Sequence, residues 1–111
     1  MTLARDIYAC TRSFPKEEAF GIIAQMRRAA VSVPSNIAEG HGRTTDKSFR
    51  LFLSQARGSV FELETQLELA ADLKYLPSAD AENLTAACEE IARMLNALLN
   101  VLKEKESVTE D

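Results

Sequence analysis

The chain has 111 residues, of which 46% are hydrophobic and 27% are charged, and its formal net charge is −4 at pH 7. This length suits one domain with a single core and excludes a two-domain enzyme with a cleft between its halves. Four glycines, three prolines and no long apolar run favour helices over strands and exclude a membrane span, which needs about 20 consecutive apolar residues.

The first predicted helix lies before Pro15. Its apolar residues are spaced by four, three and four positions, which puts them on one face of a helix: Leu3, Ile7, Cys10 and Phe14. Proline pushes the preceding residue out of the α region, so the helix is expected to end there. This stretch has no basic segment followed by an apolar one, which argues against a signal peptide and for a cytoplasmic location.

The second predicted helix covers residues 15–40. Its apolar residues keep a helical spacing along the whole segment: Phe20, Ile23, Met26, Ala30, Val33 and Ile37. Pro34 removes one backbone hydrogen bond and crowds the preceding turn, so we expect a kink near residues 32–35. Two shorter helices are the alternative. Gly40 and Gly42 are expected to end this segment.

The third predicted helix begins at a cap formed by Thr44 or Thr45 and runs to about Tyr75. Its inner face is Phe49, Phe52, Ala56, Val60, Leu63, Leu67 and Ala70. A second apolar row, Leu51, Leu53, Leu69 and Leu73, exceeds what a bundle interior requires and predicts self-association. Gly58 is a poor helix former, so a neighbouring backbone is expected to approach it closely.

The fourth predicted helix follows a turn at Pro77, with Ser78 as its candidate cap. It contains a regular heptad, expected to supply its core face: Leu84, Ala87, Ile91, Met94, Leu98 and Val101. We expect one domain over residues 1–106 and a disordered acidic tail at 107–111. Four amphipathic helices joined by short turns predict an all-α fold, an antiparallel up-down-up-down four-helix bundle.

Charge is unevenly divided along the chain. Residues 1–60 carry nine Lys and Arg against five Asp and Glu, and residues 61–111 carry four against twelve. The basic half is suited to a phosphate backbone or an acidic partner. Alternatively, it pairs with the acidic half inside the bundle or between subunits.

No enzymatic pattern is found. The single histidine, His41, belongs to no metal-binding motif, and the chain has no Cys-x-x-Cys and no phosphate-binding glycine loop. Cys10 and Cys88 are too few and too far apart for a disulfide framework or a zinc site, so both are expected to be small buried residues. We therefore expect no catalytic residue, no metal and no cofactor.

One polar stretch stands out in the second helix. Small and polar residues surround its proline, and their polar groups need partners if they are buried: Ser32, Pro34, Ser35, Asn36 and Glu39. Arg27, Arg28 and Gln66 are the candidate partners. The stretch is interpreted as a polar network that locks the kink or as part of an oligomer interface.

Three blocks carry a family resemblance: SFPKEEAFGI, QMRRAAVSVPSNIAEGHGR and FLSQARGSVFELETQLELA. In this order and spacing they resemble bacterial four-helix bundle proteins first noted as products of intervening sequences in 23S rRNA genes. The resemblance covers roughly residues 5–105. The accessory protein of diversity-generating retroelements is a more distant relative. The resemblance implies a homopentameric ring, which in the retroelement relative binds nucleic acid and the reverse transcriptase through a basic surface.

The resemblance also implies roles for individual residues. The basic positions that match its blocks, or lie between them, are Arg27, Arg28, Arg43, Arg50 and Arg57. The structural positions are Asn36 and Glu39 in the middle block and Gly58 and Glu62 in the last.

We therefore expect a non-enzymatic homo-oligomer that binds structured RNA, a ribonucleoprotein or a nucleic-acid-processing protein through this basic half. The alternative is a protein–protein scaffold in which the same arginines reach the acidic rows of neighbouring subunits, such as Glu64 and Glu68.

Overall fold

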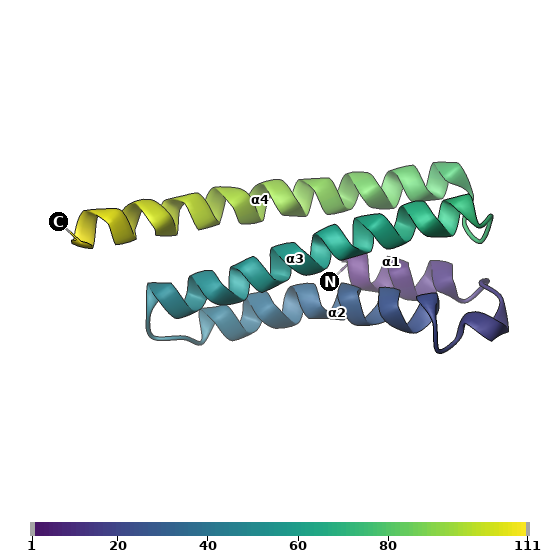
Figure 1. The fold of residues 1–111 in the computed structure, drawn as a ribbon, viewed down its shortest axis with the longest axis horizontal. Coiled ribbons are helices and arrows are strands. Elements are labelled where there is room, and N and C mark those ends of the chain that lie inside the picture. The colour runs from purple at the N-terminus through teal and green to yellow at the C-terminus, as the bar shows by residue number, and fades with distance from the viewer. Residues whose placement is uncertain (1, 111) are drawn as a thin grey trace.

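The computed structural model describes residues 2–110 of the chain, with side chains up to residue 105. The described residues form helices and no strands (Figure 1): α1 (Thr2–Thr11), a single 3₁₀ turn η1 (Lys16–Glu18), α2 (Ile22–His41), α3 (Asp46–Asp72) and α4 (Ser78–Glu110). None of these helices has the length and apolarity needed to cross a membrane.

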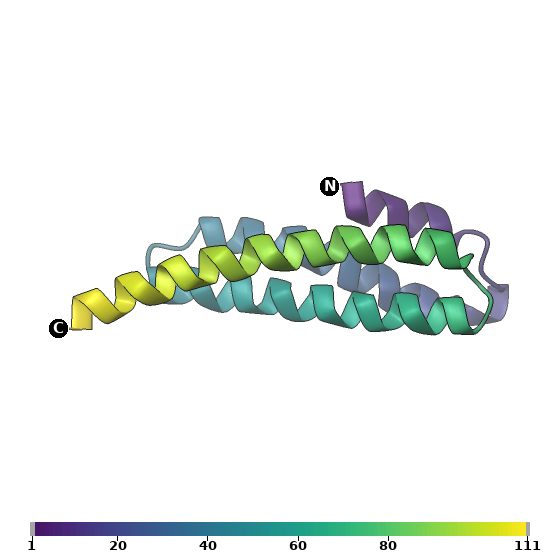
Figure 2. The ribbon, with the colours of Figure 1, turned by 90° about the horizontal axis from the view of Figure 1, so that it is seen from above.

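The helices form an antiparallel four-helix bundle, as predicted. Each helix packs against the next in the chain, and α4 also packs against α1. Neither α1 and α3 nor α2 and α4 are in contact among the described residues, so these pairs lie at opposite corners of the bundle (Figure 2). The result is a rod of 54 × 22 × 19 Å.

The rod has four helices over only part of its length. α1 has 10 residues and α4 has 33, which correspond to about 15 Å and 50 Å at 1.5 Å per residue. α1 lies beside the end of the rod that holds the α3–α4 turn, and the other end contains α2, α3 and α4 alone (Figures 1 and 2). One corner of the bundle is therefore open over the second half of α4.

Local signals explain the ends of α3. The Thr45 side chain accepts a hydrogen bond of 3.1 Å from the Ser48 N–H, as an N-cap does. At the other end Lys74 adopts a left-handed backbone with φ of 66°. The N–H of Tyr75 then bonds to the carbonyl of Ala70, and that of Lys74 to the carbonyl of Ala71. This is a Schellman motif, built here without the usual glycine.

The prediction of one helix over residues 15–40 is wrong at its start. Residues 16–18 form the separate turn η1, and α2 begins only after Gly21, whose backbone is not helical. Phe20, assigned to the apolar face, is instead 98% exposed in this break. Beyond the break α2 continues through Pro34 as one helix, as predicted, and it ends at His41 before Gly42.

The heptad of the fourth helix does not supply its buried face. The buried residues lie in the neighbouring row of the helix: Ala81, Cys88, Ala92, Leu95, Leu99 and Leu102. The first half of the heptad, Leu84 to Ile91, is half-buried against the core, whereas Met94 is 66% and Val101 52% exposed. The physical reason is the length of α1, since this row faces the corner of the bundle that α1 fills over only about 15 Å of the 54 Å rod.

The end of α4 also differs from expectation. The helix continues to Glu110, through four of the five residues predicted as a disordered tail, and Asp111 lies outside the described residues. The sequence after Glu104 contains no glycine or proline that would stop the backbone hydrogen bonding.

Candidate nucleic-acid interface

The polar stretch of α2 forms a contact between α2 and α3. Ser32 Oγ and Ser59 Oγ lie 2.8 Å apart, and the Asn36 side-chain amide donates to the carbonyl and hydroxyl oxygens of Ser32. Pro34 is half-buried and Ser35 is exposed. Ser32 and Asn36 therefore form a small polar network with Ser59. Arg27 and Arg28, predicted as partners of this stretch, bind other residues in the described part of the chain.

Gln66 of α3 has a buried side-chain oxygen. Its Oε1 has no hydrogen-bond partner among the described residues. A buried amide oxygen without a donor costs about 1–3 kcal/mol.

Arg27 fastens α1 to α2. Its Nε donates a 2.9 Å hydrogen bond to Thr11 Oγ1, and a second nitrogen donates to the Tyr8 carbonyl at 3.4 Å. The guanidinium also lies 4.6 Å from the centre of the Tyr8 ring. This arginine therefore has a structural role inside the protomer.

Arg28 forms an exposed ion pair with Glu62 of α3. One of its nitrogens donates to both carboxylate oxygens of Glu62, at 3.0 and 3.3 Å, and to Gln25. The pair is well exposed, with 60% of the Arg28 side chain and 41% of the Glu62 side chain accessible. Exposed ion pairs are worth at most about 1 kcal/mol, so Glu62 competes only weakly with another anion for this arginine.

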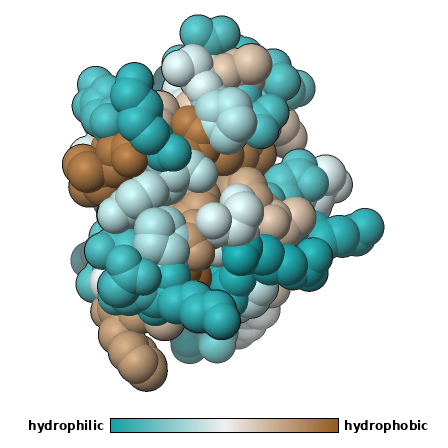
Figure 3. Space-filling model, turned by 90° about the vertical axis from the view of Figure 1, so that its right-hand side faces the viewer, coloured by the Kyte–Doolittle hydropathy of each residue, from teal (hydrophilic) through white to brown (hydrophobic). Residues whose placement is uncertain are grey.

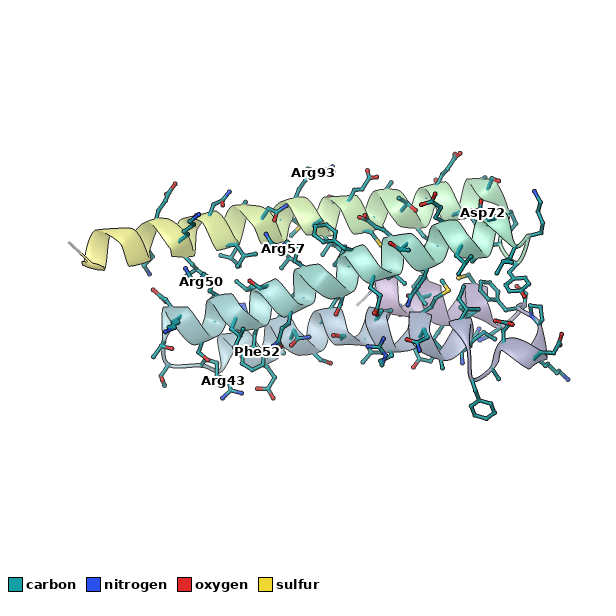
Figure 4. The ribbon with its side chains drawn as sticks, viewed as in Figure 1. Arg43, Arg50, Phe52, Arg57, Asp72 and Arg93 are labelled. Atoms are coloured by element: carbon teal, nitrogen blue, oxygen red, sulfur yellow. The ribbon has the colours of Figure 1, made fainter. Side chains whose placement is uncertain are left out.

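The other three candidate arginines lie toward the end of the rod that holds the α2–α3 turn. Arg43 donates to Glu39 and stacks on the Phe52 ring at 4.7 Å, and Arg57 donates to Asn96 on α4. Arg50 lines a groove of about 440 Å³ with Lys47 and other residues of early α3. Arg50 and Arg57 point toward the α4 side of α3, and Arg43 points the other way (Figure 4).

The structure thus places the five candidate arginines in two groups and not in one patch. Arg27 and Arg28 of α2 form the first group, and Arg43, Arg50 and Arg57 form the second, the Arg43 group. Two lysines omitted from the sequence prediction of this site lie near the Arg43 group: Lys47 in the first turn of α3, and Lys105 of α4, which binds Asp46 at 3.2 Å. Lys47 could have been found from the sequence, because it lies three residues before Arg50 on a helix. Lys105 could not, since its proximity to early α3 depends on helix packing.

The opposite end of the α3–α4 pair is acidic. A groove of about 590 Å³ between these helices is lined by five carboxylates, Glu64, Glu68, Asp72, Glu82 and Glu89. Burial, followed by the charge of Glu89, raises the pKa of Glu64. Asp72 lies far along α3 from Arg50 (Figure 4). Figure 3 looks onto this end and shows hydrophilic side chains over most of it, with hydrophobic residues between them.

Both thiols are held in the protonated form. Burial, then the charges of Glu64 and Glu89, raises the pKa of Cys88 to about 12, and burial is also the main cause that raises the pKa of Cys10. A nucleophilic cysteine needs the opposite shift. Within the described part of the chain, no three His, Cys, Asp or Glu residues are grouped so that they could hold a metal ion.

The family model described as 23S rRNA-intervening sequence protein matches residues 1–97. No curated protein matches the chain.

Proposed function

This chain belongs to the 23S rRNA-intervening sequence protein family, and from that premise we propose that it is a non-enzymatic homo-oligomer that binds structured RNA, or a ribonucleoprotein partner, through basic residues of its N-terminal half. A homopentameric ring and a cytoplasmic location are parts of the same proposal. The oligomer would present several copies of the basic surface to one RNA, which raises the overall affinity without new contacts.

The observation that carries the proposal is the separation of charge along α3 and the turn before it. Arg43, Lys47 and Arg50 lie toward one end, and the carboxylates of the α3–α4 groove toward the other. A net charge of −4 is therefore compatible with a local basic surface. Arginine is suited to this role because its planar guanidinium can donate two hydrogen bonds to one phosphate.

The test is the binding of structured RNA by fluorescence anisotropy over a range of salt concentrations. The double variant Lys47→Glu/Arg50→Glu should weaken binding at least tenfold and reduce the log–log salt slope by about one unit for each phosphate that the protein no longer neutralises. Arg5→Glu is the matched control, because it reverses an exposed charge on α1, diagonally opposite α3. No binding near 50 mM salt, or an equal loss in the control, would contradict the proposal.

The second candidate function is a homo-oligomeric scaffold without nucleic-acid binding. The observation that favours it is the number of large apolar side chains exposed on all three long helices, among them Val31, Leu51 and Met94. In this alternative Arg28 would reach an acidic row of a neighbouring subunit. Arg28→Glu should then reduce the assembled mass in light scattering, whereas an RNA contact at Arg28 predicts unchanged mass and weaker RNA binding.

A further inference from the structure

Phe20 is the most exposed large hydrophobic side chain in the described part of the chain. It is 98% accessible, whereas Met94, the next in order, is 66% accessible. The ring lies between the 3₁₀ turn η1 and α2, next to Gly21, whose backbone is not helical. Nearly all of its surface is therefore accessible to a partner, and covering a phenylalanine ring is favourable.

Phe20 lines a groove of about 690 Å³ together with residues of α1 and α2. The lining combines two aromatic rings, Tyr8 and Phe20, with two arginines, Arg27 and Arg28, and its other members are small or aliphatic side chains and one serine. Among the described residues, no carboxylate lines this groove.

The charge around the groove is positive. Residues 2–32, which include the whole lining, carry five Lys and Arg and three Asp and Glu. Glu62 of α3 reaches the same region, where it pairs with Arg28, and both side chains of this pair are exposed. Because an exposed pair contributes little, a phosphate can take the place of the Glu62 carboxylate at Arg28. The groove therefore favours an anion over a cation.

Arg27 is held in position before any ligand arrives. Its Nε donates to Thr11 Oγ1, and its guanidinium lies 4.6 Å from the centre of the Tyr8 ring. Within the described part of the chain these neighbours are uncharged, so the positive charge of Arg27 is not neutralised by contact. A fixed cation lowers the ordering entropy lost on binding.

A planar apolar group next to an anion fits this combination, and a nucleotide supplies both. Unpaired bases stack on aromatic side chains of proteins, while arginines contact the neighbouring phosphates. The bases of a duplex are already stacked on one another, so a duplex offers charge to the arginines but no base face to Phe20.

We propose that this groove binds an unpaired nucleotide of RNA, with Phe20 stacked on the base and Arg28 bound to a neighbouring phosphate. The inference rests on the proposed function and deepens it, because it names the part of the RNA that the first group of arginines takes.

The experiment uses a reporter at position 20. The chain contains no tryptophan, so Phe20→Trp introduces a single one, whose emission is quenched when a base stacks on it. A short single-stranded oligouridine should quench this emission, and the duplex that it forms with oligoadenosine should leave it nearly unchanged.

Fluorescence anisotropy measures the affinities of the full-length variants. Phe20→Ala should weaken oligouridine binding at least about fivefold and leave duplex binding unchanged. Arg28→Gln should lower the log–log salt slope for oligouridine by about one unit. Met94→Ala is the matched control, because it shortens an exposed apolar side chain on α4, which does not contact α2 among the described residues.

Three results would overturn this inference and leave the proposed function in place. They are the absence of quenching by oligouridine, wild-type oligouridine binding by Phe20→Ala, and equal quenching by polyglutamate, which would assign the groove to an acidic peptide. Emission typical of a buried tryptophan in the free variant would also overturn it, because a second copy of the chain would then cover position 20. A wild-type protein that binds neither oligouridine nor the duplex would refute the proposed function, and this inference with it.

Discussion

Gly40 and Gly58 lie in helices of the same bundle, and replacing each by alanine should have opposite effects on stability. A Cβ at Gly40 would lie 2.7 Å from Phe49 Cδ1 and 3.2 Å from Phe52 Cβ, whereas a Cβ at Gly58 meets no atom within 4 Å. Both variants gain about 1 kcal/mol or less of helix propensity, and the gain is smaller at Gly40 because it lies in the last turn of α2. Overpacking costs about 1–3 kcal/mol, and it applies to Gly40 alone.

The free energies of unfolding of the two variants should therefore differ by about 1–3 kcal/mol, with Gly58→Ala the more stable. The assay is urea unfolding followed by circular dichroism, at protein concentrations low enough to favour the monomer. Phe49→Leu provides a check, since a smaller side chain at position 49 should reduce the cost of Gly40→Ala. Equal stabilisation by the two alanines would refute the reasoning, because the Phe49 ring would then move aside at no cost.

Three further predictions follow from single contacts. Lys74→Gly should raise the free energy of unfolding by roughly 1 kcal/mol in urea denaturation, because glycine adopts the left-handed backbone of the Schellman motif without steric cost; a loss of stability would contradict the assigned motif. Arg27→Ala should cost about 1–3 kcal/mol and speed hydrogen exchange mainly in α1, because it removes the charge-assisted bond to Thr11; exchange that rises equally in all helices would argue against a local clamp. The Cys88 thiol has a pKa of about 12 in the folded chain, against an ordinary value of 9.0. It should therefore stabilise the folded state fully below pH 9, and progressively less as the pH rises toward 12. Cys88→Ala should flatten this decline in stability, which is measured as the urea midpoint against pH.

The number of helices and their antiparallel order could be predicted from apolar spacing, because each helix must bury one face. The choice of face in α4 could not. Two adjacent rows of that helix are apolar, and Leu95 is buried while its neighbour Met94 is exposed. The spacing of apolar residues shows that a row is apolar, but the positions of the other helices decide which row is buried in the core.

The sequence did not predict the break before α2, because the local signals there favour a continuous helix. Pro15 is a normal first residue of a helix and Phe20 matches the apolar spacing, so local signals support an earlier start. The backbone at Gly21 is what sets the two segments apart. A glycine is compatible with either outcome, and its neighbours in sequence do not decide between them.

The candidate site was predicted as a set of residues without its geometry. The arginines were identified by their charge and by the family resemblance of the sequence, and in the structure they have different roles. Arg27 is committed to α1, Arg57 to Asn96, and Arg28 to an exposed ion pair. These partners come from other helices, at sequence separations of 16 to 39 residues, so no local pattern could reveal them.

The position of α1 has a consequence for the order in which the bundle assembles. Contacts between α2 and α3 and between α3 and α4 join helices that are adjacent in sequence, whereas the contact of α1 with α4 joins helices at opposite ends of the described chain. Loop-closure entropy favours the adjacent hairpins, so they should form first. During synthesis α4 leaves the ribosome after the other three helices. The groove that holds α1 is therefore complete only once α4 has emerged, and a nascent chain should keep α1 loosely attached until then.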